Sequence, residues 1–179
     1  MWRGTDGMRV LVAEDEPLVA GVIARELAAI RAVVVGQAVD GRQAVEMTCE
    51  VKPDVILVDI EMPELNGVDA VREIQYLQPT PAVMLTVYSG QEKVAGAAAA
   101  GAEAYLVKPP RARELERAIM IASARFEDLM EMRRLTAELQ EALAHVKRLQ
   151  GLLPICMYCH KIRNEREAWD SLERYVMEH

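Results

Sequence analysis

The chain has 179 residues, of which 51% are hydrophobic, 27% charged and 4% aromatic, with a formal net charge of −7. This length suits one domain with a modest appendage, and the composition argues against a disordered or low-complexity chain. The acidic balance and the scarcity of aromatic residues argue against a nucleic-acid-binding surface. No apolar run reaches the roughly 18–20 residues that span a bilayer, and the first residues lack the apolar core of a signal peptide. We therefore expect a cytoplasmic protein with no membrane partner.

From Met8 onward, strand patterns and helix patterns alternate. Short apolar runs typical of buried strands occur at residues 9–13, 33–36, 55–58, 82–85 and 104–107. Apolar residues at helical spacing follow the strands, and an Ala-rich stretch predicts a helix over 94–100. Cys49 falls in the second helical pattern, where we expect a small buried residue. Five strands separated by helices predict an α/β domain over residues 8–124, with a doubly wound five-stranded parallel sheet.

A long helical pattern begins near Leu115. Apolar residues recur in steps of three and four as far as Leu153, as in a heptad repeat, with a phase break near 129–132. A helix of about 30 residues spans about 45 Å, which exceeds the size of the preceding domain. We therefore expect residues 125–153 to form a projecting helical linker that pairs with a second chain as a coiled coil. The alternative is an amphipathic helix packed back on its own domain.

Acidic, hydroxyl and basic residues stand where the predicted strands end. The set comprises Glu14 and Asp15 after the first strand, Asp59 after the third, Thr86 after the fourth and Lys108 after the fifth. Ligands of an open parallel sheet bind beyond the carboxyl ends of its strands, so these side chains should converge. Three carboxylates repel one another unless a cation lies between them, and their oxygen atoms suit Mg²⁺. A hydroxyl and an ammonium can hold phosphoryl oxygens, and a carboxylate can be a nucleophile, so the set predicts phosphoryl transfer.

Four motifs contain these residues. They are Val-Ala-Glu-Asp-Glu at 12–16, Val-Asp-Ile-Glu-Met-Pro-Glu-Leu-Asn-Gly at 58–67, Leu-Thr-Val-Tyr-Ser at 85–89 and Ala-Tyr-Leu-Val-Lys-Pro at 104–109. With these motifs, each in its expected context, residues 8–124 closely resemble the receiver domain of two-component response regulators. The resemblance implies a response regulator of a two-component phosphorelay that signals through its helical tail. Its catalysis would be confined to its own phosphorylation and dephosphorylation, so it would not otherwise be an enzyme.

The resemblance also implies a phosphoacceptor and a metal site. Asp59 would accept the phosphoryl group from a histidine kinase. Asp15 and Asp59 would ligate Mg²⁺ together with the backbone carbonyl of Glu61, and Glu14 would hold a metal-bound water. Glu61 stands at a position that varies in the family and tunes the lifetime of the phosphate.

Further roles follow from the same resemblance. Thr86 and Lys108 would bind the phosphoryl group, and Thr86 and Tyr105 would form the conformational switch. Without the family, Tyr105 would be interpreted as an amphipathic strand residue at the sheet surface. The peptide bond between Lys108 and Pro109 would be cis. Val87 is a departure from the family, which usually has a smaller residue after the threonine.

Residues 154–179 have a different character. The motif Cys156-Met-Tyr-Cys159-His160 looks like a Cys-x-x-Cys module appended to some bacterial sensory and response-regulator proteins, in which a second cysteine pair follows. Two thiolates need two further ligands for tetrahedral zinc, and the candidates are His160, His179 or the cysteine pair of a second chain. Alternatives are two unliganded cysteines, a thioredoxin-like redox pair or a c-type haem attachment site, although the cytoplasm is the wrong compartment for haem attachment. The segment can also be a truncated metal-binding module.

Two other functions share part of this pattern. The helical region resembles the linker of response regulators that carry ANTAR RNA-binding domains, which makes an RNA-binding antiterminator one alternative. However, residues 125–179 contain nine Lys or Arg against ten Asp or Glu, and no ANTAR helices follow, so we expect no nucleic-acid partner. A small Mg²⁺-dependent phosphotransfer enzyme would share the strand-end chemistry, and a deep substrate pocket beside Asp59 would favour it.

Overall fold

The structure is a computed structural model that describes residues 5–87, 102, 104–150, 156, 158–159, 161–163 and 169–171. The chain divides into two compact units, Met1–Met130 and Glu131–His179. The helix predicted over 94–100 lies outside the described residues. Among the described helices, none combines the length and apolar character needed to cross a membrane.

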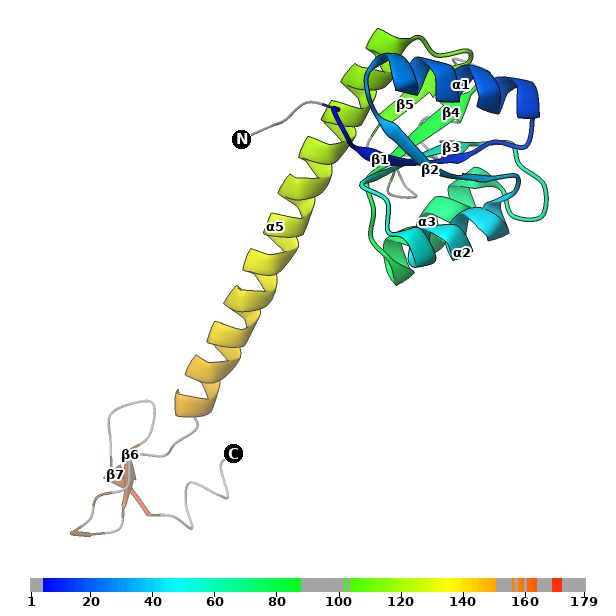
Figure 1. Ribbon diagram of the computed structural model, residues 1–179. Coiled ribbons are helices and arrows are strands. Elements are labelled where there is room, and N and C mark those ends of the chain that lie inside the picture. The colour runs from blue at the N-terminus through cyan, green and yellow to red at the C-terminus, as the bar shows by residue number, and fades with distance from the viewer. Residues whose placement is uncertain are drawn as a thin grey trace. The chain divides into compact units, whose positions relative to one another are not determined.

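The first unit is built on a five-stranded parallel sheet (Figure 1). Its strands are β1 (Arg9–Ala13), β2 (Val33–Ala38), β3 (Val55–Asp59), β4 (Ala82–Thr86) and β5 (Ala104–Val107). Their order in the sheet is β2-β1-β3-β4-β5, and every residue of β3 and β4 is buried. This confirms the predicted doubly wound fold. The second strand extends two residues beyond its predicted end at Gly36, because its pairing with β1 continues to Ala38 after a register shift.

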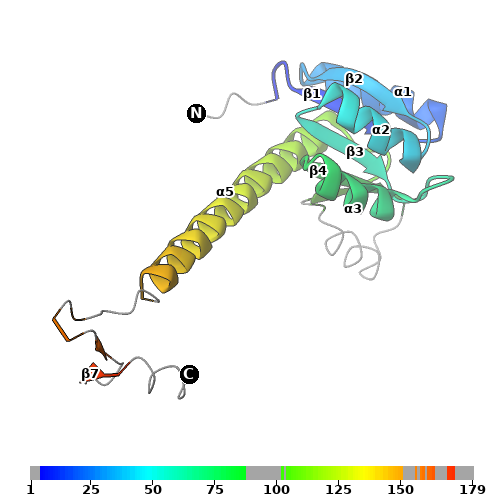
Figure 2. The same cartoon turned by 90° about the horizontal axis from the view of Figure 1, so that it is seen from below.

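Helices cover both faces of the sheet. Within the residues that the structure describes, the helices of this unit are α1 (Pro17–Ala29), α2 (Gly41–Val51), α3 (Gly67–Leu77) and the first part of α5 (Ala112–Gln150). On one face, Ile23 of α1 and Leu115 and Ile119 of α5 pack against the strands. On the other face, Val45 of α2 and Ile74 of α3 do so. Figure 2 shows the helices α2 and α3 of this face from below. Because both faces are covered, a ligand approaches this sheet at the ends of its strands.

Two helices begin with side-chain caps next to the strand ends. The carboxylate of Asp40 accepts a hydrogen bond from the backbone N–H of Gln43 at the start of α2. The amide oxygen of Asn66 accepts one from the N–H of Asp69 at the start of α3. Such caps satisfy N–H groups that the helix itself leaves unpaired. The sequence therefore specifies where α3 starts, just beyond the end of β3.

The long helix α5 changes character along its length. Leu115, Ile119 and Ala122 are fully buried in the core of the first unit. From residue 131 to residue 145, every side chain is exposed. This change coincides with the phase break that the sequence places near 129–132. The heptad pattern therefore has two parts, of which the earlier one packs on the sheet of its own chain.

Cys49 is exposed, so its prediction as a buried residue is wrong. The buried side of α2 is formed by Ala44, Val45 and Thr48. The hydroxyl of Thr48 donates a hydrogen bond to the carbonyl oxygen of Ala44 at 2.7 Å, so a polar side chain is buried without an unpaired donor. Cys49 follows about 100° further around the helix and faces outward.

Candidate functional site

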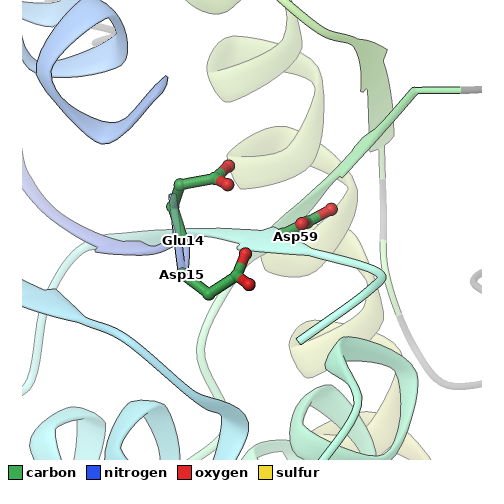
Figure 3. Close-up of side chains that lie close together, drawn as sticks. All are labelled: Glu14, Asp15 and Asp59. Atoms are coloured by element: carbon green, nitrogen blue, oxygen red, sulfur yellow. The ribbon is translucent and has the colours of Figure 1, made fainter. Parts of the chain in front are cut away.

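The carboxyl groups of Glu14, Asp15 and Asp59 meet at the carboxyl-terminal edge of the sheet. One ligand oxygen of each lies within 4.8 Å of the others. Figure 3 shows Glu14 and Asp15 at the end of β1 and Asp59 at the end of β3. The register accounts for this, because the strands are neighbours and Ala13 pairs with Val58, the residues just before Glu14 and Asp59. The cluster presents three acidic groups to a single small volume.

Lys108 places an ammonium among these carboxylates. Its Nζ atom lies 2.5 Å from Oε2 of Glu14 and 2.7 Å from Oδ2 of Asp59, and its side chain is 9% exposed. Its backbone N–H donates a hydrogen bond to the carbonyl oxygen of Thr86 at 2.8 Å, which joins the ends of β5 and β4. The peptide bond to Pro109 is cis, as predicted. The ammonium therefore balances part of the carboxylate charge.

Burial affects the protonation of two of these groups. Burial, aided by the nearby charge of Asp59, raises the pKa of Glu14 above its ordinary value, although the hydrogen bond and the charge of Lys108 act to lower it. Burial works to lower the pKa of Lys108, but hydrogen bonds with Asp59 and Glu14 and the charges of both carboxylates raise it overall. Lys108 therefore stays charged at neutral pH. Glu14 holds its proton more firmly than an exposed glutamate does.

Other predicted residues surround the cluster. Thr86 is the last residue of β4 and is 4% exposed. Glu61 is exposed in the loop between β3 and α3. Tyr105 is 52% exposed on the edge strand β5, beside a hollow of about 300 Å³ that Arg117 and Ile121 of α5 also line. The phosphoryl-binding role of Thr86, the carbonyl ligand of Glu61 and the switch role of Tyr105 remain predictions.

Sequence reasoning did not anticipate two features of the site. The first is the pairing of Lys108 with Glu14, because the sequence indicated only a phosphoryl-binding role for this lysine. The second is the closeness of α3 to Asp59, since a Cβ atom on Gly67 would lie 1.8 Å from the carbonyl oxygen of Asp59. The Asn66-Gly67 pair signals a turn in the sequence. The same glycine also lets the helix approach the strand end closely.

The cysteine motif lies in the second unit. Cys156 and Cys159 flank a turn at Tyr158, and the N–H of Cys156 donates a hydrogen bond to the carbonyl oxygen of Lys161 at 2.9 Å. The sulfur of Cys156 accepts hydrogen bonds from the backbone N–H groups of Cys159 and Tyr158 and interacts with the Cys159 thiol, which lowers the pKa of Cys156. A two-stranded antiparallel pair follows, formed by β6 (Ile162–Arg163) and β7 (Trp169–Asp170). His160 and His179, the predicted further zinc ligands, lie outside the described residues.

Comparison with known proteins defines the class. Residues 10–120 match the response regulator receiver domain, and the chain belongs to this family. Over 148 residues, it is 40% identical to the transcriptional regulatory protein PdtaR of Mycobacterium tuberculosis, an alignment that covers 81% of this chain and 72% of that protein. The protein is thus a response regulator of two-component signalling.

Solved structures agree with this assignment. The signal receiver domain of the putative response regulator NarL from Mycobacterium tuberculosis has a TM-score of 0.61 and 29% identity, covering 66% of this chain and 98% of that one. The receiver domain of the sensor histidine kinase PA1611 from Pseudomonas aeruginosa has a TM-score of 0.58 and 33% identity, covering 63% and 94%. That structure holds a magnesium ion in its active-site cleft. The flavodoxin-like receiver fold is therefore common to all three proteins.

Proposed function

We propose that Asp59 of this response regulator accepts a phosphoryl group from a histidine kinase, with Mg²⁺ as cofactor. The observation that carries the proposal is the meeting of Glu14, Asp15 and Asp59 within 4.8 Å, with Lys108 at 2.7 Å from Asp59. A carboxylate oxygen of Asp59 attacks the phosphorus, the bond from phosphorus to the donor nitrogen breaks, and an acyl phosphate forms. The leaving imidazole of the kinase keeps the bonding electron pair.

The surrounding residues suit the roles of cation ligands and phosphoryl ligands. Asp15 and Asp59 would hold Mg²⁺ with the carbonyl of Glu61, and Glu14 would do so through water, because Mg²⁺ prefers oxygen ligands and retains water. When bound, the ion would supply positive charge that offsets the negative charge of the carboxylates and of the phosphoryl group. Lys108 adds a second positive charge close to Asp59. The magnesium ion in the cleft of PA1611, a relative in fold, supports this assignment.

Labelling with a small acyl phosphate tests the proposal. In the presence of Mg²⁺, we expect the full chain to gain the mass of one phosphoryl group, located on Asp59 by peptide mapping. Asp59→Asn should lose the label, because an amide is not a nucleophile for this transfer. The matched control is Asp128→Asn, which removes an exposed carboxylate on α5 and should label normally. Label retained in Asp59→Asn, or mapped to another residue, overturns the assignment.

We further propose the division of the chain that the sequence suggests, with a receiver domain over 8–124, a helical linker over 125–153 and a cysteine-containing tail over 154–179. The similarity to PdtaR covers 148 residues, which is more than the family match over 10–120, and this supports a function for the linker. Catalysis would be confined to phosphorylation and dephosphorylation of the chain itself, in the cytoplasm.

We also propose that the linker pairs with a second copy of the chain. Over residues 112–145 of α5, whose side chains are described, four large apolar residues are each more than half exposed: Met132, Leu135, Leu139 and Leu143. Their spacing of three and four residues places them on one stripe of the helix. Arg134, beside the stripe, bonds to Glu131 and Glu138 of its own helix, so these charges are already paired. A second identical stripe is the partner that matches such a surface.

Charge placed in the stripe tests the pairing. Leu135→Lys with Leu139→Lys should give a monomer by light scattering, because two ammonium groups would have to be buried in the seam. The control is Gln140→Lys, which adds a lysine at an exposed position next to the stripe and should leave a dimer. A monomeric wild-type chain at high concentration contradicts the proposal.

The cysteine pair is proposed to bind zinc. Zinc takes thiolate ligands at about 2.3 Å in tetrahedral geometry, and Cys-x-x-Cys spacing provides two of the four positions. The hydrogen bonds from the backbone of Tyr158 and Cys159 to the Cys156 sulfur favour the thiolate that a metal needs. Metal analysis of the full chain purified under reducing conditions tests this, and absence of zinc contradicts it.

A further inference from the structure

We propose that Gly41, at the start of α2, is a positioning residue for the Mg²⁺ site, because it fixes the loop of residues 60–66 that joins β3 to α3. None of the clustered carboxylates of Glu14, Asp15 and Asp59 belongs to α2. The inference rests on the proposed metal site, since the loop contains the carbonyl group that is its proposed third protein ligand. It assigns to α2 a control of metal affinity from outside the site.

Gly41 brings the backbone of α2 into contact with the backbone of the loop. The residue is buried at the first position of the helix. A Cβ atom on Gly41 would lie 2.8 Å from the carbonyl carbon of Leu65, and closer still to its carbonyl oxygen. Cβ atoms do not come within 3.0 Å of backbone atoms. Any side chain at position 41 therefore has to displace either the helix or Leu65.

The start of α2 is firmly held. The carboxylate of Asp40 accepts a hydrogen bond from the backbone N–H of Gln43 at 2.7 Å. The side-chain oxygen of Gln43 accepts one from the N–H of Val39, also at 2.7 Å. Arg42 forms an ion pair at 3.0 Å with Glu73 of the neighbouring helix α3 (Figure 1). Because the next turns of α2 are buried on one side, the helix resists displacement.

The turn over residues 63–65 of the loop is the softer partner in this contact. It is closed by a single hydrogen bond, from the N–H of Leu65 to the carbonyl oxygen of Pro63 at 2.7 Å. Glu64 has a φ angle of 61°, in the left-handed region that residues with a side chain rarely adopt. Such a conformation costs free energy and persists only where its surroundings hold it. We therefore expect a methyl group at position 41 to shift this turn and not α2.

A shift of the turn is transmitted to Glu61, because the loop is closed on itself. The N–H of Gly67 donates a hydrogen bond to the carbonyl oxygen of Ile60 at 3.0 Å, so the two ends of the loop meet. Met62, which is 9% exposed, anchors the loop in the hydrophobic core. Glu61 lies between Ile60 and Met62. Its carbonyl group therefore cannot keep its direction when the rest of the short loop is displaced.

The affinity for Mg²⁺ is the property that should respond. The carboxylates of the cluster stand at strand ends whose register the sheet fixes, so a shifted loop leaves them in place. Mg²⁺ requires ligands close to ideal octahedral positions, so a displaced loop carbonyl weakens binding. Loss of a group that orients a metal ligand commonly costs about 10–100-fold in affinity. We expect Gly41→Ala to raise the dissociation constant of Mg²⁺ about tenfold or more.

Calorimetric titration of the full chain with Mg²⁺ tests the proposal. The matched control is Gly21→Ala, which adds the same methyl group to α1, where it would meet nothing within 4 Å, and should bind Mg²⁺ like the wild type. A second control is Gly36→Ala, whose added atom meets the flexible end of Met47 away from the loop. It strains the packing of β2 on α2 and should also leave the affinity unchanged.

Acyl phosphate labelling provides a second measurement on the same variants. At saturating Mg²⁺, Gly41→Ala should be labelled on Asp59 to the wild-type extent, and only the Mg²⁺ concentration that gives half of the effect should rise. A variant that is merely less stable would not show this separation. Leu65→Ala, which removes the side chain that packs the loop against the core, should raise the dissociation constant as well. It takes the place of Gly41→Ala if circular dichroism shows the latter unfolded.

Two results would overturn the proposal. One is an unchanged dissociation constant in folded Gly41→Ala, or in Leu65→Ala where Gly41→Ala does not fold. The other is an equal rise in Gly36→Ala, which would attribute the effect to general strain. If the wild-type chain binds no Mg²⁺, or Asp15→Asn binds it equally well, the metal site itself is wrong and this inference is lost with it. Failure of the positioning role and failure of the proposed function are therefore distinguishable.

Discussion

At the scale of single residues, Glu14 is 3% exposed, and its carboxyl group shares one ammonium with a second carboxylate. Its raised pKa means that the folded protein binds this proton more tightly than the unfolded chain does. The contribution of Glu14 to stability is therefore fully present below its ordinary pKa of 4.5. It falls as the pH rises from there through the raised pKa of the folded state.

Glu14→Gln should consequently stabilise the Mg²⁺-free protein at pH 8. The amide is neutral at every pH and can still accept a hydrogen bond from Lys108, so the unfavourable burial of a charge is removed. We expect a higher midpoint of thermal unfolding than in the wild type at pH 8, and a difference that shrinks toward pH 4. A lower midpoint at pH 8 would show that the ion pair with Lys108 outweighs the cost of burial.

A second prediction concerns Val87, which follows Thr86, and the rate of dephosphorylation. Its side chain is 62% exposed at the end of β4, is β-branched and is stiff about χ1. We expect it to crowd the water that attacks the phosphoryl group on Asp59, and Glu61 to add a like charge. Val87→Ala should therefore speed dephosphorylation, and a tenfold change needs about 1.4 kcal/mol in the barrier.

Loss of the phosphoryl label over time measures this effect. The control is Val33→Ala, an exposed valine at the start of the edge strand β2, which should leave the rate unchanged. An unchanged or slower loss in Val87→Ala means that this side chain does not gate the water. The assignment of Asp59 is unaffected by that result.

At the scale of elements, the position of α3 depends on one glycine. A Cβ atom on Gly67 would lie 1.8 Å from the backbone oxygen of Asp59, so Gly67→Ala must push the helix away from the strand. We expect a loss of at least about 1–3 kcal/mol in the free energy of unfolding, the usual cost of overpacking. Denaturant titration of Gly67→Ala measures it.

Gly21 on α1 provides the comparison. A Cβ atom there would meet nothing within 4 Å, and its backbone is helical. Gly21→Ala should therefore be neutral or stabilise the protein by about 0.4–1 kcal/mol. If both alanine variants lose the same stability, the contact between Gly67 and Asp59 is not the cause.

The strands were predictable from the sequence, with their ends correct to within two residues, and individual contacts were less predictable. Central strands such as Val55–Asp59 have continuous apolar runs because both faces are buried, and a charged residue marks where the apolar run ends. The prediction that Asp15, Asp59 and Lys108 lie at one edge of the sheet is therefore confirmed. It could not predict that the flexible Lys108 side chain reaches Glu14, because that depends on side-chain direction and burial. The predicted burial of Cys49 was wrong for a related reason, because the neighbouring Thr48 occupies the buried side of α2 instead.

At the scale of the whole molecule, the carboxylate cluster should link stability to Mg²⁺. A ligand that binds only the folded state stabilises it by about 2.7 kcal/mol at a concentration 100 times its dissociation constant. We expect Mg²⁺ to raise the unfolding midpoint of the wild-type chain and of Asp128→Asn. Asp15→Asn should lose most of that increase, because it removes one of the three clustered carboxylates.

For the same variant we expect the opposite effect on stability when Mg²⁺ is absent. Asp15→Asn relieves repulsion among carboxylates, so its Mg²⁺-free form should be at least as stable as the wild type. Thermal unfolding with and without Mg²⁺ measures both effects in one series. A Mg²⁺ response that is equal in Asp15→Asn and the wild type contradicts the proposed metal site.

Lys108 makes two contacts that connect the central strand of the sheet with its edge strand. Through Nζ, the residue touches Asp59 at the end of the middle strand, and through its backbone N–H it is fastened to Thr86 at the end of β4. It also directly follows β5, the outermost strand, on which Tyr105 is half exposed. We therefore expect that a group which displaces the ammonium from Asp59 also changes the position of the end of β5. In this way a chemical change at the buried Asp59 could alter the exposed surface of the domain at β5.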